Sequence, residues 1–221
     1  MSFNIVKPSN LDDTILYIEF RNINKNNALS LLMLDELAAI LSQKYLRNKY
    51  QVIVFRGYKD SPFSAGADLN DVKSLKKINN IDIYHNKLNL VLTKLSQLKV
   101  LKVSVLKDFC IGAGFIFAMH TDICIANSSC LFSIPASKLN IKLPKAQLDF
   151  LLDKYPKNLL LKEILFTGRN FTATEALNFN LINLVYEDKD FKKYYLDFLS
   201  SFTKNNKKIQ EYYFNKIYIK R

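Results

Sequence analysis

Apolar residues recur along the chain in two spacings, which predict a succession of strands and helices. Short apolar runs rich in strand-forming residues predict β-strands at 15–20, 52–55, 103–106, 123–126, 131–134 and 184–186. Apolar positions at helical spacing predict helices from Ser30 to about Tyr45, over 81–98 and over 190–202. Thr172 and Glu175 form the capping box of another helix, which ends near Phe179. The elements form recurring units of two strands and a helix.

Two turns of small residues separate a strand from a helix. The turn at 62–69 follows the 52–55 strand and leads into a polar helix near Asp71. The turn at 111–114 comes after the 103–106 strand and opens a short helix expected over 114–120. A turn of this kind presents free backbone N–H groups to an anion. Two such turns can direct two N–H groups at one carbonyl oxygen, the arrangement called an oxyanion hole.

The residues of these turns resemble the signatures of the crotonase, or enoyl-CoA hydratase/isomerase, superfamily. Residues 63–69 are similar to its F-[SC]-[AS]-G-A-D-L motif, and 112–114 stand where the family has G-G-G. Residues 25–30 resemble its K-x-N-A-L loop, 121–123 its C-D-I, and 166–177 its L-T-G…A-x-E-A. The resemblance extends from about Ile5 to Tyr186. It implies the α/β crotonase (ClpP/crotonase-like) fold, a superhelix of repeated β-β-α units with a helical C-terminal part.

The resemblance also implies site residues. The N–H groups of Ala67 and Ala113 are expected to hold the carbonyl oxygen of a thioester, while Asn27, Ala28 and Leu29 would line the coenzyme A channel. The other residues expected at the substrate are Ala65, Gly66, Asp68, Gly112, Gly114, Ile116, Pro135 and Ala136. Asp68 and Asp122 are acidic, but in the family these positions mostly brace loops.

The chain departs from the family at both catalytic carboxylates. Hydratases carry one glutamate two residues after G-G-G and a second just after a proline, where this chain has Ile116 and Ala136. Neither side chain can act as a general acid or base, so ordinary hydration is not expected. Lys138 is a tentative substitute, because decarboxylating crotonases have a lysine at this place; the alternative is that it points to solvent. Tyr84 and His85 are secondary candidates.

Length and composition indicate one domain over 1–221, with a shortened C-terminal helical region at about 188–221. The chain has 221 residues, of which 49% are hydrophobic, and lacks both an apolar run of about 20 residues and a secretory signal. A cytoplasmic protein with no membrane partner is therefore expected. The tail at 203–221 is either a solvated helix or a segment whose lysines meet coenzyme A phosphates. The resemblance implies a homotrimer or a dimer of trimers.

The formal net charge of +12 also permits a nucleic-acid interpretation. The lysines are scattered, however, and no nucleic-acid signature is present, so no nucleic-acid partner is expected. Cys110, Cys124 and Cys130 are expected to be reduced and packed, and two histidines do not indicate a metal site. No cofactor is expected beyond the coenzyme A that forms part of a substrate.

Three hypotheses follow. The chain could be an enzyme that stabilises the enolate of an acyl-CoA or acyl-carrier thioester, such as a decarboxylase or another lyase or isomerase. It could instead be an inactive homologue that acts as a binding or assembly subunit. Nucleic-acid binding driven by charge is the third and weakest hypothesis.

Overall fold

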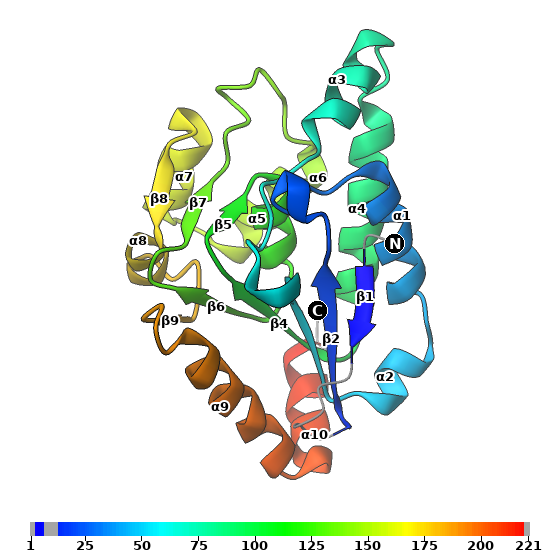
Figure 1. The fold of residues 1–221 in the computed structure, drawn as a ribbon, viewed down its shortest axis with the longest axis vertical. Coiled ribbons are helices and arrows are strands. Elements are labelled where there is room, and N and C mark those ends of the chain that lie inside the picture. Colours follow the sequence, from blue (N-terminus) through cyan, green and yellow to red (C-terminus); the bar gives the residue numbers. More distant parts are fainter. Residues whose placement is uncertain (1–2, 7–12, 219–221) are drawn as a thin grey trace.

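A six-stranded sheet runs through the molecule, for which the computed structural model describes residues 3–6 and 13–218 (Figure 1). Its strands, in spatial order, are β1 (Phe3–Val6), β2 (Ile15–Phe20), β3 (Val52–Gly57), β4 (Leu101–Leu106), β6 (Ile123–Asn127) and β9 (Leu184–Tyr186). β1 pairs antiparallel with β2, and every other neighbouring pair is parallel.

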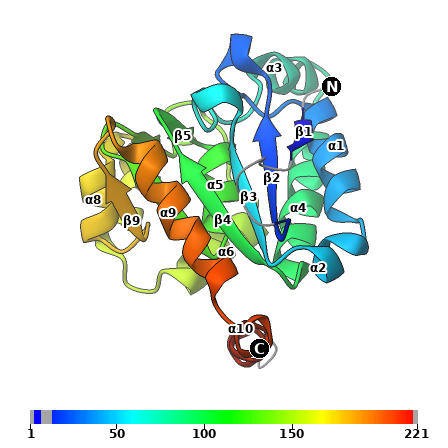
Figure 2. The same ribbon diagram turned by 60° about the horizontal axis from the view of Figure 1, so that its bottom comes forward.

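Helices bury both faces of this sheet, which explains why its strands read as continuous apolar runs. Side chains of β2 alternate between two cores: Leu16 and Ile18 belong to one, Ile15 and Tyr17 to the other. The first core is covered by α1 (Leu31–Leu41), α4 (Asp82–Gln97) and α5 (Ala113–Met119). The second is covered by α9 (Phe191–Lys204), which crosses the opposite face (Figure 2).

A second, three-stranded sheet lies beside the first in the order β5 (Phe109–Ile111), β7 (Leu131–Ser133) and β8 (Asn170–Thr172). β5 and β7 are parallel, whereas β7 and β8 are antiparallel. Between β7 and β8 the chain forms α6 (Lys145–Lys154) and α7 (Leu159–Thr167), and α8 (Ala173–Asn178) follows β8. Because β5 ends directly before α5, this small sheet positions the second glycine turn.

Two predicted helices have different bounds in the structure. The helix from Ser30 ends at Leu41, not near Tyr45. Ser42 is its C-cap residue, and both its hydroxyl and its N–H donate to Ala38 O. A separate helix, α2 (Tyr45–Lys49), follows. The polar helix expected near Asp71 is α3 (Leu69–Lys77), since Asp68 caps it by accepting a hydrogen bond from Asn70 N.

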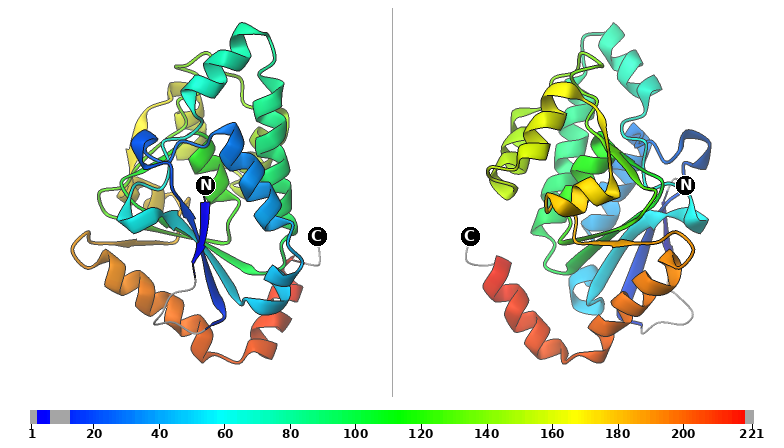
Figure 3. Two further views of the ribbon diagram at one scale, coloured as in Figure 1. Left: turned by 45° about the vertical axis from the view of Figure 1, so that its right-hand side comes forward. Right: turned by 90° about the vertical axis from the view of Figure 1, so that its left-hand side faces the viewer.

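Other elements agree with the sequence or were not predicted from it. The strands at 15–20 and 184–186 and the capping box of Thr172 and Glu175 are confirmed. α6 and α7 were not predicted. The tail forms a helix, α10 (Lys207–Tyr218), which lies at the end of α9 on the outside of the molecule (Figure 3).

Candidate functional site

The first turn follows β3 and is fastened to β5, the strand that leads into the second turn. Ser64 forms a parallel bridge with Cys110. Its N–H donates to Phe109 O at 2.9 Å, and its carbonyl accepts from Ile111 N at 3.0 Å. The buried Ser64 hydroxyl donates to Asn27 O at 2.8 Å. Backbone and side-chain hydrogen bonds therefore hold the two turns together.

Glycines at both turns allow this close approach. A Cβ on Gly66 would lie 2.9 Å from Ile111 O, and its φ of +98° disfavours any side chain. A Cβ on Gly114, in the first turn of α5, would lie 2.6 Å from Ser64 Cβ. The F-S-A-G-A-D and G-A-G patterns thus belong to a single contact between two backbones.

The N–H groups of Ala67 and Ala113 make no hydrogen bond with any residue in 3–6 or 13–218. The N–H groups beside Ala67 are used: Gly66 N donates to the Ser64 hydroxyl, and Asp68 N to Leu29 O. A Cβ on Gly66 would lie 3.6 Å from Ala113 N, so the two donors belong to touching turns. Two backbone donors are available there.

The loop expected to line the coenzyme channel is held by hydrogen bonds within itself and to the segment at the start of the first turn. The Asn27 amide donates to Ser61 Oγ at 3.0 Å and to Pro62 O at 2.6 Å, and its oxygen accepts from Asn22 N at 2.9 Å. Asn22 also binds Ala28 O through its own amide. Asn27, Ala28 and Leu29 are all buried. The Asn27 side chain therefore braces the first turn, and Asn22, which no local sequence pattern marks, holds the loop closed.

Tyr84 supports the first turn from α4. Its hydroxyl donates to Leu29 O at 2.9 Å, and the same carbonyl accepts from Asp68 N. Leu29 forms a parallel bridge with Ala67. Burial raises the pKa of Tyr84 well above its usual value, so the phenol stays protonated and remains a donor. Tyr84, a secondary catalytic candidate in the sequence, is placed here as a support for the Ala67 backbone.

Both aspartates have structural partners. Asp68 caps α3 and forms an ion pair with Lys25 Nζ at 2.6 Å. Asp122 pairs with Lys102 Nζ at 2.9 Å, and its carboxylate also accepts from Lys102 N. Lys102 and Asp122 are nearly fully buried. These bonds agree with the loop-bracing role expected for both positions.

Apolar side chains occupy the two glutamate positions. Ile116 lies on α5 with 1% of its surface exposed, and the half-buried Ala136 packs against the same core. Pro135 reaches the second turn, since its Cδ would lie 3.9 Å from a Cβ on Gly112. The wall next to this turn is therefore apolar at both positions.

Lys138 is exposed. Its methylene groups lie over Gly168, at 3.2 and 3.4 Å from where a Cβ on that glycine would be. Its ammonium group has no hydrogen bond or ion pair with the described part of the chain. The catalytic role of Lys138 stays a prediction.

Within the described residues, neither histidine side chain makes a hydrogen bond to the two turns. His120 stacks on Phe150 and bonds through Nδ1 to Ile116 O, and burial lowers its pKa to about 4. His85, half-buried on α4, lies near Asp82, and burial lowers its pKa too. Both imidazoles are therefore neutral at pH 7.

The cysteines are buried free thiols. Burial raises the pKa of all three, which makes them poor nucleophiles. Over the described ranges, no cluster of three or more His, Cys, Asp or Glu side chains could hold a metal ion. In the same ranges, no helix combines the length and apolarity needed to cross a membrane.

Comparison with known proteins identifies the class of protein to which this chain belongs. The sequence model of the enoyl-CoA hydratase/isomerase family matches residues 10–216. The chain therefore belongs to the enoyl-CoA hydratase/isomerase family.

Individual relatives are distant. The chain is 26% identical over 176 residues to probable enoyl-CoA hydratase 2, mitochondrial, of Arabidopsis thaliana, covering 80% of this chain and 58% of that protein. It is 28% identical over 166 residues to the short-chain-enoyl-CoA hydratase of Clostridium acetobutylicum, covering 74% and 62%. The chain thus spans about three fifths of the length of these curated relatives.

Among solved structures, an enoyl-CoA hydratase/carnithine racemase from Magnetospirillum magneticum superposes with a TM-score of 0.88. The two are 20% identical, and the match covers 98% of this chain and 80% of the other. This similarity confirms the fold that the sequence motifs implied.

Proposed function

We propose that this protein binds an acyl-CoA or acyl-carrier thioester and stabilises its enolate through the N–H groups of Ala67 and Ala113. The observation that carries the proposal is the pair of unpartnered N–H groups on two touching turns. Negative charge develops on the thioester oxygen when a bond breaks at the α-carbon, or at a γ-carbon that is conjugated with the carbonyl group through a double bond. Each preorganised donor lowers the barrier by about 3 kcal/mol in sites of this kind.

Standard hydration is not part of the proposal. Adding water to a double bond requires one group to activate water and another to deliver a proton. Ile116 and Ala136 can do neither.

Decarboxylation fits this site better than hydration does. In a substrate such as glutaconyl-CoA, the bond from the γ-carbon to the carboxylate breaks and CO₂ leaves. The electron pair passes through the conjugated double bond to form the dienolate, whose oxygen the two N–H groups stabilise. A proton from the Lys138 ammonium or from water then completes the product. This chemistry needs only the oxyanion hole and a proton source, which agrees with an apolar wall.

An inactive, ligand-binding homologue is the second candidate. It is favoured by the exposure of Lys138 and by the apolar residues at both glutamate positions. It predicts thioester binding without turnover, and no effect of Lys138→Ala on any reaction.

Calorimetric titration with coenzyme A, crotonyl-CoA and glutaconyl-CoA tests the ligand. We expect acyl-dependent binding at micromolar strength, about 8 kcal/mol. Turnover is then followed as CO₂ release and as solvent deuterium entering the α- or the γ-carbon. Thioester binding without CO₂ release or deuterium uptake would favour the inactive homologue. If none of the coenzyme A compounds binds, both candidate functions are excluded for coenzyme A thioesters, and only a thioester on a carrier protein is left as the ligand.

Two substitutions of Ala113 separate the effect of its backbone N–H group from the effect of its side chain. Ala113 is the first residue of α5, where proline is compatible with helix geometry but removes the donor. We expect Ala113→Pro to lower the rate by about 10²–10³-fold. The matched variant Ala113→Gly keeps the N–H group and should keep the rate. Equal losses in both variants would argue against an oxyanion donor at this position.

A further inference from the structure

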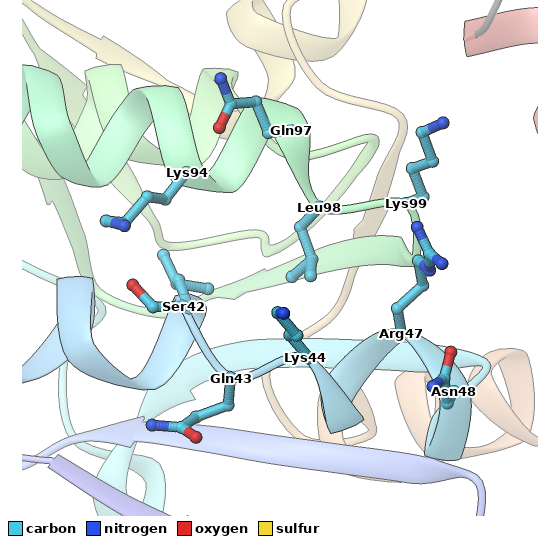
Figure 4. Close-up of a pocket in the computed structure, with 10 residues that line it drawn as sticks. Ser42, Gln43, Lys44, Arg47, Asn48, Lys94, Gln97, Leu98 and Lys99 are labelled. Atoms are coloured by element: carbon cyan, nitrogen blue, oxygen red, sulfur yellow. The ribbon is translucent and has the colours of Figure 1, made fainter.

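An open pocket of about 590 Å³ lies at the end of the molecule opposite the two turns. It is formed where α1 and α4 end and where α2 begins. Figure 4 shows Lys94 and Gln97 of α4 on one side of it and Arg47 and Asn48 of α2 on the other. α2 precedes β3, whereas the first turn follows it. β3 is six residues long, about 20 Å at the rise of a strand, so the pocket and the candidate substrate site are separated by the length of the sheet.

The pocket is strongly basic at its rim. Lys44, Arg47, Lys94 and Lys99 line it, and no lining residue is acidic. Leu41 and Leu98, both nearly fully buried, supply apolar surface. Its volume lies within the range of roughly 300–1,000 Å³ found for small-molecule sites.

The four cations have no partner in the described residues. None of them makes an ion pair or a hydrogen bond there. Elsewhere the chain does pair such groups, as in Lys25 with Asp68 and Arg169 with Glu163. Like charges gathered around one hollow repel each other, and an anion placed between them would relieve this repulsion.

Helix ends do not account for these charges. The carboxyl ends of α1 and α4 each carry the equivalent of about half a negative charge, less in sum than four cations. Where this chain uses a lysine to satisfy helix-end carbonyls, the bond is direct: Lys102 Nζ donates to Leu98 O at 3.2 Å, and Lys154 Nζ to Met119 O at 2.5 Å. The pocket lysines make no such bonds.

We infer that this pocket is a second binding site, which takes a small ligand carrying a pyrophosphate group next to an apolar or aromatic part. Two adjacent phosphates match several cations on a common rim, with Arg47 able to bind in a bidentate manner. Leu41 and Leu98 would contact the apolar part. The inference does not depend on the proposed thioester function, because it concerns the other end of the sheet.

Inorganic pyrophosphate is the probe for the test, titrated calorimetrically into the full chain. We expect saturable binding of one ion per chain and a higher melting temperature in its presence. The double variant Lys44→Gln/Arg47→Gln should weaken binding at least about tenfold, since hydrogen bonds to charged groups have this effect. Absence of saturable binding to the unmodified chain would overturn the inference.

A charge-matched control separates a site from general attraction. Lys162→Gln/Lys192→Gln removes the same two charges from exposed positions on α7 and α9 and should leave pyrophosphate affinity unchanged. Equal weakening in both double variants would show non-specific charge and refute the site. Tighter, strongly salt-dependent binding of a single-stranded oligonucleotide that the pocket variant abolishes would also refute it, in favour of a nucleic-acid surface.

Measuring acyl-CoA and pyrophosphate affinities on the same variant tests whether the pocket and the candidate substrate site are separate sites. If an acyl-CoA binds as proposed above, the Lys44→Gln/Arg47→Gln variant should keep that affinity. A parallel loss of acyl-CoA and pyrophosphate binding would place the pocket in the coenzyme site and overturn the inference of a second one.

Discussion

At the scale of single residues, the site depends on a few side chains that hold backbone in place. Tyr84 is the clearest case, because its hydroxyl bonds to the carbonyl of Leu29, the residue bridged to Ala67. Such a residue acts on chemistry through the position of a backbone donor. Stability and reaction rate should therefore respond differently when it is changed.

Tyr84→Phe should destabilise the fold by about 1 kcal/mol, the usual value of one hydrogen bond. Tyr84→Phe should also slow thioester turnover, because the Ala67 N–H group loses its support. We expect the fold-decrease in kcat to exceed the fold-change in KM. Urea unfolding and steady-state kinetics measure the two effects. The control is Tyr155→Phe, whose hydroxyl bonds to Met119 Sδ at 3.2 Å and to Leu181 O at 3.4 Å, at the end of α5 away from the second turn. Tyr155→Phe should lower the free energy of unfolding without changing kcat or KM. Equal decreases in kcat in both variants would contradict a positioning role for Tyr84.

Gly114→Ala tests the contact between the two turns. Alanine favours a helix over glycine by about 1 kcal/mol, but here its methyl group would lie 2.6 Å from Ser64 Cβ. We expect a net destabilisation of about 1–3 kcal/mol from overpacking. Thermal unfolding of Gly114→Ala, Ser64→Gly and the double variant forms a mutant cycle. The double variant should lose less than the sum of the singles, and strict additivity would mean that the clash does not exist.

At the scale of elements, α8 is stabilised at its start by a capping box and by charge. Thr172 Oγ1 accepts from Glu175 N, and the Glu175 carboxylate accepts from Thr172 N. The bond from Thr172 N and the neighbouring Arg169 lower the pKa of Glu175 below its usual value of 4.5. A carboxylate with a lowered folded-state pKa contributes stability above the unfolded pKa and loses it as pH falls through the folded one.

Glu175→Gln should accordingly lower the melting temperature at pH 7. This difference from the unmodified protein should shrink as the pH falls from 4.5 through the lower folded-state pKa, because the Glu175 carboxylate of the original chain is then increasingly protonated. Thr172→Ala is the comparison: it keeps the Glu175 carboxylate and its bond from the backbone N–H of position 172. Its loss of about 1 kcal/mol should therefore change less with pH than the loss in Glu175→Gln. Calorimetric melting scans at intervals of about one pH unit between about pH 3 and pH 7 distinguish a pH-dependent loss from a nearly constant one. A constant gap for Glu175→Gln would contradict the assignment.

The buried pair of Lys102 and Asp122 links β4 to the start of β6. Removing one partner leaves a buried charge without compensation, so Asp122→Ala should destabilise the protein by about 3–5 kcal/mol in urea unfolding. Asp149→Ala, which removes an exposed pair with Lys145, should change stability little. Loss of turnover by Asp122→Ala with normal stability would instead make Asp122 a catalytic residue.

At the scale of the whole molecule, the family resemblance predicts a homotrimer or a dimer of trimers. Exposed apolar side chains on α10, among them Ile209, Tyr212 and Ile217, provide surface for such contacts. Light scattering coupled to size exclusion should give a mass near three times the 25.6 kDa of one chain, or six times. Shortening the chain after Asn206 should weaken the assembly if α10 takes part in it. A monomeric full chain would contradict the prediction.

Local sequence determined those features of this protein whose causes lie within a few residues. The strands Ile15–Phe20 and Leu184–Tyr186, the Ser30 cap and the capping box of α8 all rest on neighbouring side chains. The two glycine turns were also predictable, since their motifs lie within single segments. What the motifs do chemically stays a prediction.

Only the tertiary structure decided how distant segments meet. The three-residue strands β5 and β8 are too short to be recognised alone and exist because they pair with β7. Asn22 and Tyr84 reach the first turn from other segments, so no spacing in the sequence marks them. The basic pocket likewise gathers cations from 44–47 and 94–99. Local patterns encode propensity and capping, whereas a site assembled across the chain depends on the packing of the whole fold.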